Sequence, residues 1–175
     1  VLMKFSNYKF NFITKSILSF KKIITPSLYV KNLYSELFPQ IGNFRIIEHG
    51  VELKKRKIAI DSFENGIVNI AFLGVAVSHK GIDTFMDLLM DNKLKNKKIN
   101  WYIIGEIDKS VEDNLIELKN KTNLNILGKY DISNLDKILI KNKISLILLL
   151  SNVPETFSYT LTEAVQMNIP VVASN

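Results

Sequence analysis

The sequence predicts an α/β protein with a doubly wound parallel sheet, and three observations support this. From Val68 onward, short apolar runs alternate with amphipathic stretches. Several of the runs are apolar at nearly every position, which is typical of central parallel strands covered on both faces. Three of the runs end on a glycine. Strand and helix patterns in this alternation favour right-handed βαβ units in one sheet.

Five strands are predicted in this region, and between them apolar residues recur at the spacing of a helix face. The strands cover residues 68–74, 99–105, 123–128, 144–151 and 170–174. The residues expected to face inward are Ile82, Phe85, Met86 and Leu89, then Val111, Leu115 and Leu118, then Leu135, Ile138 and Leu139, and finally Leu161, Ala164 and Val165. Sheets of this kind bind ligands at the carboxyl ends of their strands.

The first third of the chain has a different pattern. Residues 21–27 and 44–50 indicate two more strands, with a helix from about Leu28 to Phe38 between them. Residues 51–67 are polar and charged and are interpreted as a linker, so the predicted domains are 1–50 and 68–175. Because the chain opens with Val1 and stops directly after an apolar run, the expected fold is incomplete at both ends.

Composition limits the possible functions. A chain of 175 residues with 47% hydrophobic residues fits one domain, or one domain and part of another, and not a disordered protein. The chain has no cysteine, which excludes disulfides and thiol chemistry, and His49 and His79 have no metal-ligand spacing around them. We therefore expect no metal and no cofactor. The net charge of +6 favours anionic partners without selecting among them.

The location of the protein is predicted from the absence of apolar spans. No run of 18 apolar residues indicates a membrane helix, and no signal peptide is recognisable, so a cytoplasmic protein is expected. The opening segment is basic and apolar. A solvated helix face is the ordinary interpretation of such a segment, and peripheral contact with the inner membrane face is the sharper one. Its lysines are Lys4, Lys9, Lys15, Lys21 and Lys22.

The first candidate site is the loop from Gly74 to Gly81, which leads directly into a helix. A helix N-terminus offers unpaired N–H groups, Lys80 adds a positive charge, and the glycines let a phosphate approach closely. The loop matches neither dinucleotide-binding nor P-loop spacing. An ordinary strand–turn–helix connection with an exposed lysine is an equal alternative. His79 is a weaker candidate, because a solvated loop histidine is the commoner outcome.

The second candidate site is the pair Glu155 and Glu163, which follow the fourth strand and have seven residues between them. Two carboxylates at a strand end can accept hydrogen bonds from sugar hydroxyls, and the N–H groups of Phe157 and Ser158 are expected to face the same cleft. The alternative is structural, because Thr160 and Glu163 have the spacing of a capping box.

Segments along nearly the whole chain resemble a known family in the expected order. They read IITPSLYVKNLY, FRIIEHGV, FLG followed by HKG, WYIIG, ILGKY and SNVPETFSYTLTEAVQMNIPVVAS. Together they resemble glycosyltransferase family 4, a retaining group with the GT-B fold, of which such a sheet is the Rossmann-like donor half. The last segment is the most specific.

The resemblance implies a nucleoside-diphosphate sugar as donor, no metal, and a glycan or lipid-linked acceptor. It assigns Lys80 to the diphosphate and Glu155 to the donor sugar as catalytic residues, with transition-state charge stabilised electrostatically. Residues 1–50 correspond to the end of the acceptor domain, whose remainder is the expected partner, and nucleic acid is not expected. The implied substrate contacts are Gly74, His79, Lys129, Phe157, Ser158 and Glu163, with Glu163 on the ribose and Lys129 beside the base.

The chain departs from the family pattern at several positions. Val75 stands where many members carry an arginine for the diphosphate, and Ser158 stands where glycine is usual. Because the resemblance stops at Asn175, residues 1–175 alone are expected to bind donor weakly and to transfer little. A non-catalytic nucleotide-sugar-binding module remains the alternative. A flavodoxin-like regulatory domain is disfavoured, since no acidic cluster follows the first strand.

Overall fold

The computed structural model describes residues 2–50 and 66–174, with side chains from residue 8 onward. The chain divides into two compact units, Val1–Val51 and Glu52–Asn175. Most of the predicted linker, residues 51–65, lies outside the described residues.

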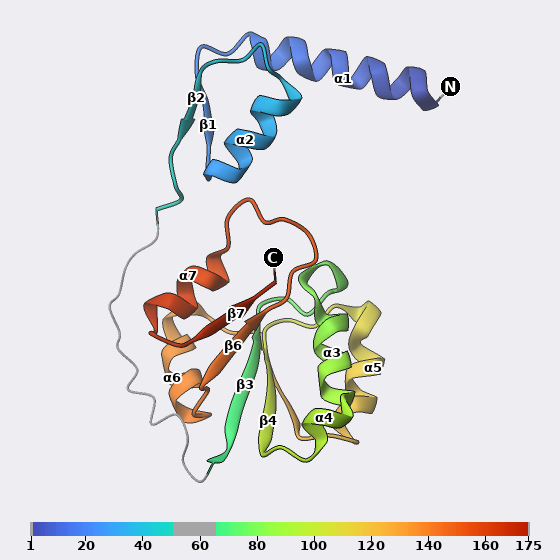
Figure 1. The fold of residues 1–175 in the computed structure, drawn as a ribbon, viewed down its shortest axis with the longest axis vertical. Coiled ribbons are helices and arrows are strands. Elements are labelled where there is room, and N and C mark those ends of the chain that lie inside the picture. The colour runs from blue at the N-terminus through green and yellow to red at the C-terminus, as the bar shows by residue number, and fades with distance from the viewer. Residues whose placement is uncertain (1, 51–65, 175) are drawn as a thin grey trace. The chain divides into compact units, whose positions relative to one another are not determined.

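The first unit is a small βαβ motif preceded by a helix (Figure 1). Its elements are α1 (Leu2–Leu18), β1 (Ile23–Thr25), α2 (Leu28–Leu37) and β2 (Phe44–Ile46). The strands are parallel, and α2 begins where the Ser27 side chain accepts a hydrogen bond from the Val30 N–H. The predicted strands and helix are confirmed, but residues 47–50 are not part of the second strand.

The second unit carries the predicted parallel sheet. Its strands are β3 (Val68–Leu73), β4 (Ile99–Ile104), β5 (Leu124–Gly128), β6 (Leu146–Leu149) and β7 (Val171–Ala173). Its helices are α3 (Ile82–Met90), α4 (Asn92–Lys95), α5 (Lys109–Lys119), α6 (Leu135–Lys141) and α7 (Tyr159–Gln166), with short 3-10 turns η2 (Ser78–Lys80) and η3 (Ile132–Asn134). The strand order is β5-β4-β3-β6-β7 with every pair parallel, which confirms a doubly wound, Rossmann-like α/β fold.

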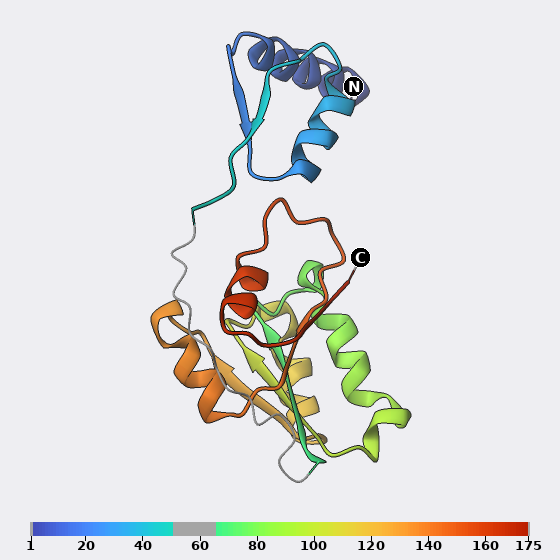
Figure 2. The same ribbon diagram turned by 60° about the vertical axis from the view of Figure 1, so that its left-hand side comes forward.

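Helices cover both faces of this sheet. Figures 1 and 2 show α3 and α5 on one side and α6 and α7 on the other. Ile82, Phe85 and Leu115 are fully buried against one face, and Leu135 and Leu139 are buried against the other. Each such side chain contributes roughly 1.5–3 kcal/mol by leaving water, so two separate hydrophobic clusters hold the strand ends in place.

The helix α7 is rotated relative to the prediction. Ala164 is fully buried as expected, but Leu161 is 39% exposed and Val165 is 64% exposed, so their predicted inward orientation is wrong. The methyl group of Thr160 lies only 3.3 Å from the position that a Cβ at Gly74 would occupy. Small residues therefore form the face that packs closely on the sheet, and the larger apolar side chains face solvent.

Two glycines let the loops at the carboxyl ends of the strands pack closely. A Cβ on Gly81 would lie 1.8 Å from the Leu150 carbonyl oxygen, and one on Gly105 would lie 1.8 Å from that of Gly74. Both glycines have positive φ, at 81° and 154°. These contacts bring the loops after β3, β4 and β6 together at one end of the sheet.

The described helices include none with the length and apolar character needed to cross a membrane.

Candidate functional site

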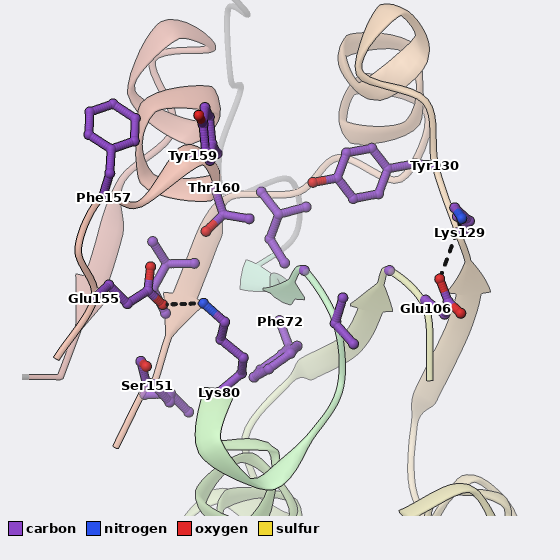
Figure 3. A pocket seen from close by; sticks show the side chains of 16 residues that line it. Phe72, Lys80, Glu106, Lys129, Tyr130, Ser151, Glu155, Phe157, Tyr159 and Thr160 are labelled. Atoms are coloured by element: carbon purple, nitrogen blue, oxygen red, sulfur yellow. Dashed lines mark hydrogen bonds and ion pairs between the residues drawn. The ribbon is translucent and has the colours of Figure 1, made fainter. Parts of the chain in front are cut away.

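A cavity of about 330 Å³ lies at the carboxyl ends of the strands (Figure 3). It opens where β3 has β4 on one side and β6 on the other, which is the point where the strand order reverses. Ligands of doubly wound sheets bind at this position, because loops diverge there to opposite faces. Its wall includes Gly74, Val75 and Lys80 from the β3 loop, Gly105 and Glu106 after β4, Lys129 and Tyr130 after β5, and Ser151, Glu155, Phe157, Tyr159 and Thr160 after β6.

Lys80 and Glu155 form an ion pair on the cavity wall. The Nζ atom of Lys80 lies 2.6 Å from Oε1 of Glu155, and Figure 3 shows the two side chains pointing toward each other. Lys80 ends the turn η2, whereas Glu155 lies in the loop between β6 and α7. The side chains are 38% and 23% exposed, so both remain accessible to a ligand in the cavity.

The charge of Glu155 is stabilised by its neighbours. Partial burial raises the pKa of its carboxyl group, but the Lys80 ammonium and hydrogen bonds from Ser158 and Ser151 outweigh burial and hold the pKa below its usual range. At neutral pH the site thus contains a carboxylate that accepts hydrogen bonds beside a cation that can neutralise an anion.

Backbone hydrogen bonds fasten the two loops that carry this pair. The Asn152 N–H donates to the His79 carbonyl oxygen at 3.1 Å, and the Ser151 hydroxyl oxygen lies 3.2 Å from the same oxygen. The Asn152 side chain donates to the Ser78 carbonyl oxygen at 3.1 Å. His79 thus positions the loops through its main chain, while its side chain is exposed and is absent from the described cavity wall.

A second carboxylate is covered by an aromatic residue. The Tyr130 hydroxyl donates a 2.7 Å hydrogen bond to Oε2 of Glu163, one turn into α7. Burial raises the pKa of Glu163, and the hydrogen bond from Tyr130 partly offsets it. Burial and the Glu163 carboxylate together raise the pKa of Tyr130 far above its usual value. Tyr130 lies on the cavity wall and Glu163 does not.

The start of α7 is set by Ser158. Its hydroxyl accepts from the Leu161 N–H at 3.3 Å and makes Ser158 the N-cap. The alternative that Thr160 and Glu163 form a capping box is wrong, because Ser158 caps the helix and the Glu163 carboxylate pairs with Tyr130. The ring of Phe157 packs edge-on against Tyr159 with centroids 5.1 Å apart.

The comparison with known families decides which family the chain belongs to. The sequence pattern of the "Glycosyl transferases group 1" family matches residues 54–175, which include every residue of the cavity wall. The chain belongs to the group 1 glycosyltransferases. No curated protein matches the chain by sequence.

Solved glycosyltransferases share the fold at low sequence identity. Anabaena HepE in complex with UDP-glucose is 18% identical with a TM-score of 0.65, covering 99% of this chain and 50% of its own. Sucrose-phosphate synthase from Thermosynechococcus elongatus is 16% identical with a TM-score of 0.71, covering 95% and 44%. A variant of S. aureus TarM in complex with Fondaparinux, alpha-GlcNAc-glycerol and UDP is 18% identical with a TM-score of 0.69, covering 93% and 31%. This group 1 chain thus spans 31–50% of the length of these structures.

The cavity of this glycosyltransferase chain brings together most of the residues selected from the sequence. Gly74, Lys80, Lys129, Glu155 and Phe157 lie on its wall. His79, Ser158 and Glu163 do not, because the first faces solvent, the second caps α7 and the third is covered by Tyr130.

Five polar residues of the cavity wall were not among the site residues selected from the sequence: Glu106, Tyr130, Ser151, Tyr159 and Thr160. Tyr130 directly follows Lys129, and its position after a strand was the available indication. Glu106 forms an exposed ion pair with Lys129, at 3.5 Å from its Nζ atom to Glu106 Oε2. The side chains of Lys129 and Glu106 are 80% and 61% exposed, so their ion pair contributes little to holding the loop in position. In the part of the chain that the structure describes, no three His, Cys, Asp or Glu residues group in a way that could hold a metal ion.

Proposed function

We propose that this chain binds a nucleoside-diphosphate sugar in the cavity at the β3 and β6 strand ends and supports transfer of its sugar to an acceptor hydroxyl. The observation that carries the proposal is the Lys80–Glu155 pair, which juxtaposes a cation for the diphosphate and a carboxylate for sugar hydroxyls at the reversal point of the sheet. A volume of about 330 Å³ lies at the lower end of the range for ligand pockets. Structures of similar fold that contain UDP or UDP-glucose favour this ligand class.

The proposed reaction follows from the charges of these two groups. The bond between the anomeric carbon and the terminal phosphate oxygen breaks, and its electron pair leaves with the diphosphate. The acceptor hydroxyl oxygen forms the new bond to the anomeric carbon and loses its proton to solvent. Lys80 stabilises the negative charge that develops on the diphosphate, because a fixed cation needs no reorganisation as the bond breaks. Glu155 orients the sugar through its hydroxyls.

The remaining candidate residues are assigned to different parts of the proposed donor. The backbone at Gly74, Phe157 and Ser158 approaches phosphate or sugar, and Lys129 borders the base. Glu163 holds the ribose hydroxyls. We expect retention at the anomeric carbon, no requirement for a metal ion, and a glycan or lipid-linked acceptor in cell-surface polysaccharide or glycoconjugate synthesis, on the basis of the family 4 resemblance. A cytoplasmic location with peripheral contact at the inner membrane face is a further part of the proposal, and the basic opening segment supports the membrane contact.

The domain roles are part of the same proposal. Residues 1–50 represent the end of an acceptor domain, residues 51–67 the linker, and residues 68–175 the donor domain. The chain spans 31–50% of the length of the compared structures. We therefore expect residues 1–175 alone to bind donor without efficient transfer.

One observation favours a second function, a non-catalytic nucleotide-sugar-binding module. Val75 lies on the cavity wall with 47% of its surface exposed, at the position where many family members carry an arginine. One cation fewer weakens stabilisation of the leaving diphosphate more than it weakens ground-state binding.

Calorimetry with UDP-glucose and with GDP-mannose tests the proposed binding. We expect one of the two to bind the 175-residue chain and Lys80→Ala to weaken it at least tenfold, as for loss of a charge-assisted contact. Lys93→Ala, which removes an exposed lysine on α4, serves as the matched control and should bind like the parent. Absence of binding to both donors, or equal weakening by the two variants, would overturn the proposal. Transfer by a protein that also contains the complete acceptor domain separates the enzyme from the binding module.

A further inference from the structure

The Tyr130–Glu163 contact has no role in the proposed reaction, and it lies beside Lys129, where the proposed function puts the base of the nucleotide. The phenol hydroxyl is 2.7 Å from Oε2 of Glu163. Tyr130 is on the cavity wall, whereas Glu163, to which the proposed function assigns the ribose, is not. Figure 3 shows the Tyr130 side chain extending from the β5 loop toward α7. The phenol therefore stands between the cavity and the carboxylate.

The contact is held in place on both sides. The Tyr130 ring packs against the cluster of buried residues beneath α6 and α7, which includes Leu135 and Ala164. Glu163 is half-buried, and a partly desolvated carboxylate needs a donor. Tyr130 supplies this donor, so the hydrogen bond is expected to be populated and not incidental.

We propose that Tyr130 is a latch that sets the affinity for the nucleotide: its phenol hydrogen-bonds to the Glu163 carboxylate, and the ribose hydroxyls of the ligand must replace it. The inference rests on the proposed function, since it requires a ribonucleotide in this cavity. Its ligand class is a nucleoside diphosphate with an intact ribose diol.

The physical consequence is an exchange of hydrogen bonds. A phenol donates one hydrogen bond to the carboxylate, whereas a 2′,3′-diol can donate two. The free energy gained when the ribose binds is therefore the difference between the diol hydrogen bonds that form and the phenol hydrogen bond that is lost. The latch thus weakens binding of the whole ligand compared with a site in which the carboxylate has no phenol partner. A weaker hold on the nucleoside diphosphate that remains after transfer favours its release, which limits turnover in many enzymes.

The decisive variant is Tyr130→Phe, which removes the hydroxyl and keeps the ring packed on its cluster. Calorimetry compares UDP with 2′,3′-dideoxy-UDP, and GDP with its dideoxy form if GDP is the nucleotide that binds. We expect Tyr130→Phe to bind the ribonucleotide about three- to tenfold more tightly than the parent, which corresponds to the release of one hydrogen bond of ordinary net strength. Its affinity for the dideoxy form, which has no hydroxyls to replace the phenol, should be unchanged.

Two further variants assign the effect to the carboxylate. In a Glu163→Gln background, the Tyr130→Phe change should alter UDP affinity by less than about twofold, because the charged acceptor is gone. Tyr102→Phe removes a hydroxyl from a tyrosine that packs on the same cluster but lies outside the cavity wall, and it should bind both nucleotides as the parent does. Thermal unfolding of each variant shows that the fold is retained.

Weaker or equal binding of UDP by Tyr130→Phe overturns the latch, as does equal tightening of UDP and the dideoxy form. If UDP binds the parent and Lys80→Ala weakens it, these results leave the proposed function standing and remove only the latch. If neither UDP nor GDP binds the parent, the proposed function fails and the latch fails with it.

Discussion

Lys80 and Glu155, 75 residues apart in the chain, meet at 2.6 Å from Nζ to Oε1. The contact joins the turn that follows β3 to the loop that follows β6. Because these loops leave the sheet on either side of the strand-order reversal, the pair links the two halves of the fold at the position where doubly wound sheets generally bind ligands.

We predict that Glu155→Gln lowers the free energy of unfolding at pH 7 by about 0.5–1 kcal/mol, a value reduced by the exposure of both side chains to solvent. The neighbours of Glu155 hold its pKa below the usual range, so its contribution is present above the unfolded pKa of about 4.3 and is lost as pH falls through the lower folded pKa. Urea unfolding at pH 7 and at about pH 3 checks this. The parent and the variant should converge at the acidic pH, and a constant difference would contradict the assignment.

The stability lost in a glycine-to-alanine substitution should depend on the space around the glycine. Gly81→Ala places a methyl group 1.8 Å from the Leu150 carbonyl oxygen, so the loops must separate and the loss should exceed about 3 kcal/mol. Gly128→Ala, at a φ of 75° with nothing within 4 Å, should lose only about 1 kcal/mol from backbone strain. Thermal unfolding orders the two variants, and equal melting temperatures would show that the close packing of the loops is not what these glycines serve.

Capping by Ser158 can be tested with a rescue variant. Ser158→Ala removes the acceptor for the Leu161 N–H and should lower stability by about 1 kcal/mol. Asparagine also caps helices, so Ser158→Asn should recover most of this loss. Chemical denaturation measures both values. Failure of Ser158→Asn to recover stability would argue against capping as the origin of the effect.

The exposed side of α7 yields a prediction opposite to the one from periodicity. Val165→Ser should change stability by less than about 0.5 kcal/mol, because 64% of Val165 is exposed. Val111→Ser, at a position only 4% exposed on α5, should lose roughly 2–3 kcal/mol. The two valine substitutions form a matched pair for thermal unfolding, and a large loss at position 165 would contradict the orientation of the helix.

The missing cation at position 75 can be supplied. Val75→Arg adds a guanidinium to the cavity wall beside the site proposed for the diphosphate, and it should tighten UDP binding about three- to tenfold. Ile116→Arg adds the same charge on the exposed surface of α5 and controls for general electrostatic attraction. Calorimetry at two salt concentrations separates the two effects, since a purely long-range attraction is screened. If Val75→Arg and Ile116→Arg tighten UDP binding equally, a direct contact between the guanidinium at position 75 and the diphosphate is contradicted.

Strand and helix positions were predictable because each depends on residues near one another in the chain. The run Ile99–Ile104 is apolar because both faces of β4 are covered, and the spacing of Phe85 and Leu89 places both on the buried face of α3. The same logic failed for Val165, because the close approach of Thr160 to Gly74 decided which face of α7 packs on the sheet. That approach depends on residues far apart in the chain.

The sequence by itself determined the doubly wound sheet, the family segment that contains two glutamates, and Lys80 and Glu155 as residues in loops that follow strands. Only the tertiary structure decided what each carboxylate contacts. Glu155 pairs with Lys80 across 75 residues and Glu163 with Tyr130 across 33. Spacing along a helix or strand encodes which residues share a face, but contact between loops is set by strand order and by how closely the glycines allow those loops to pack.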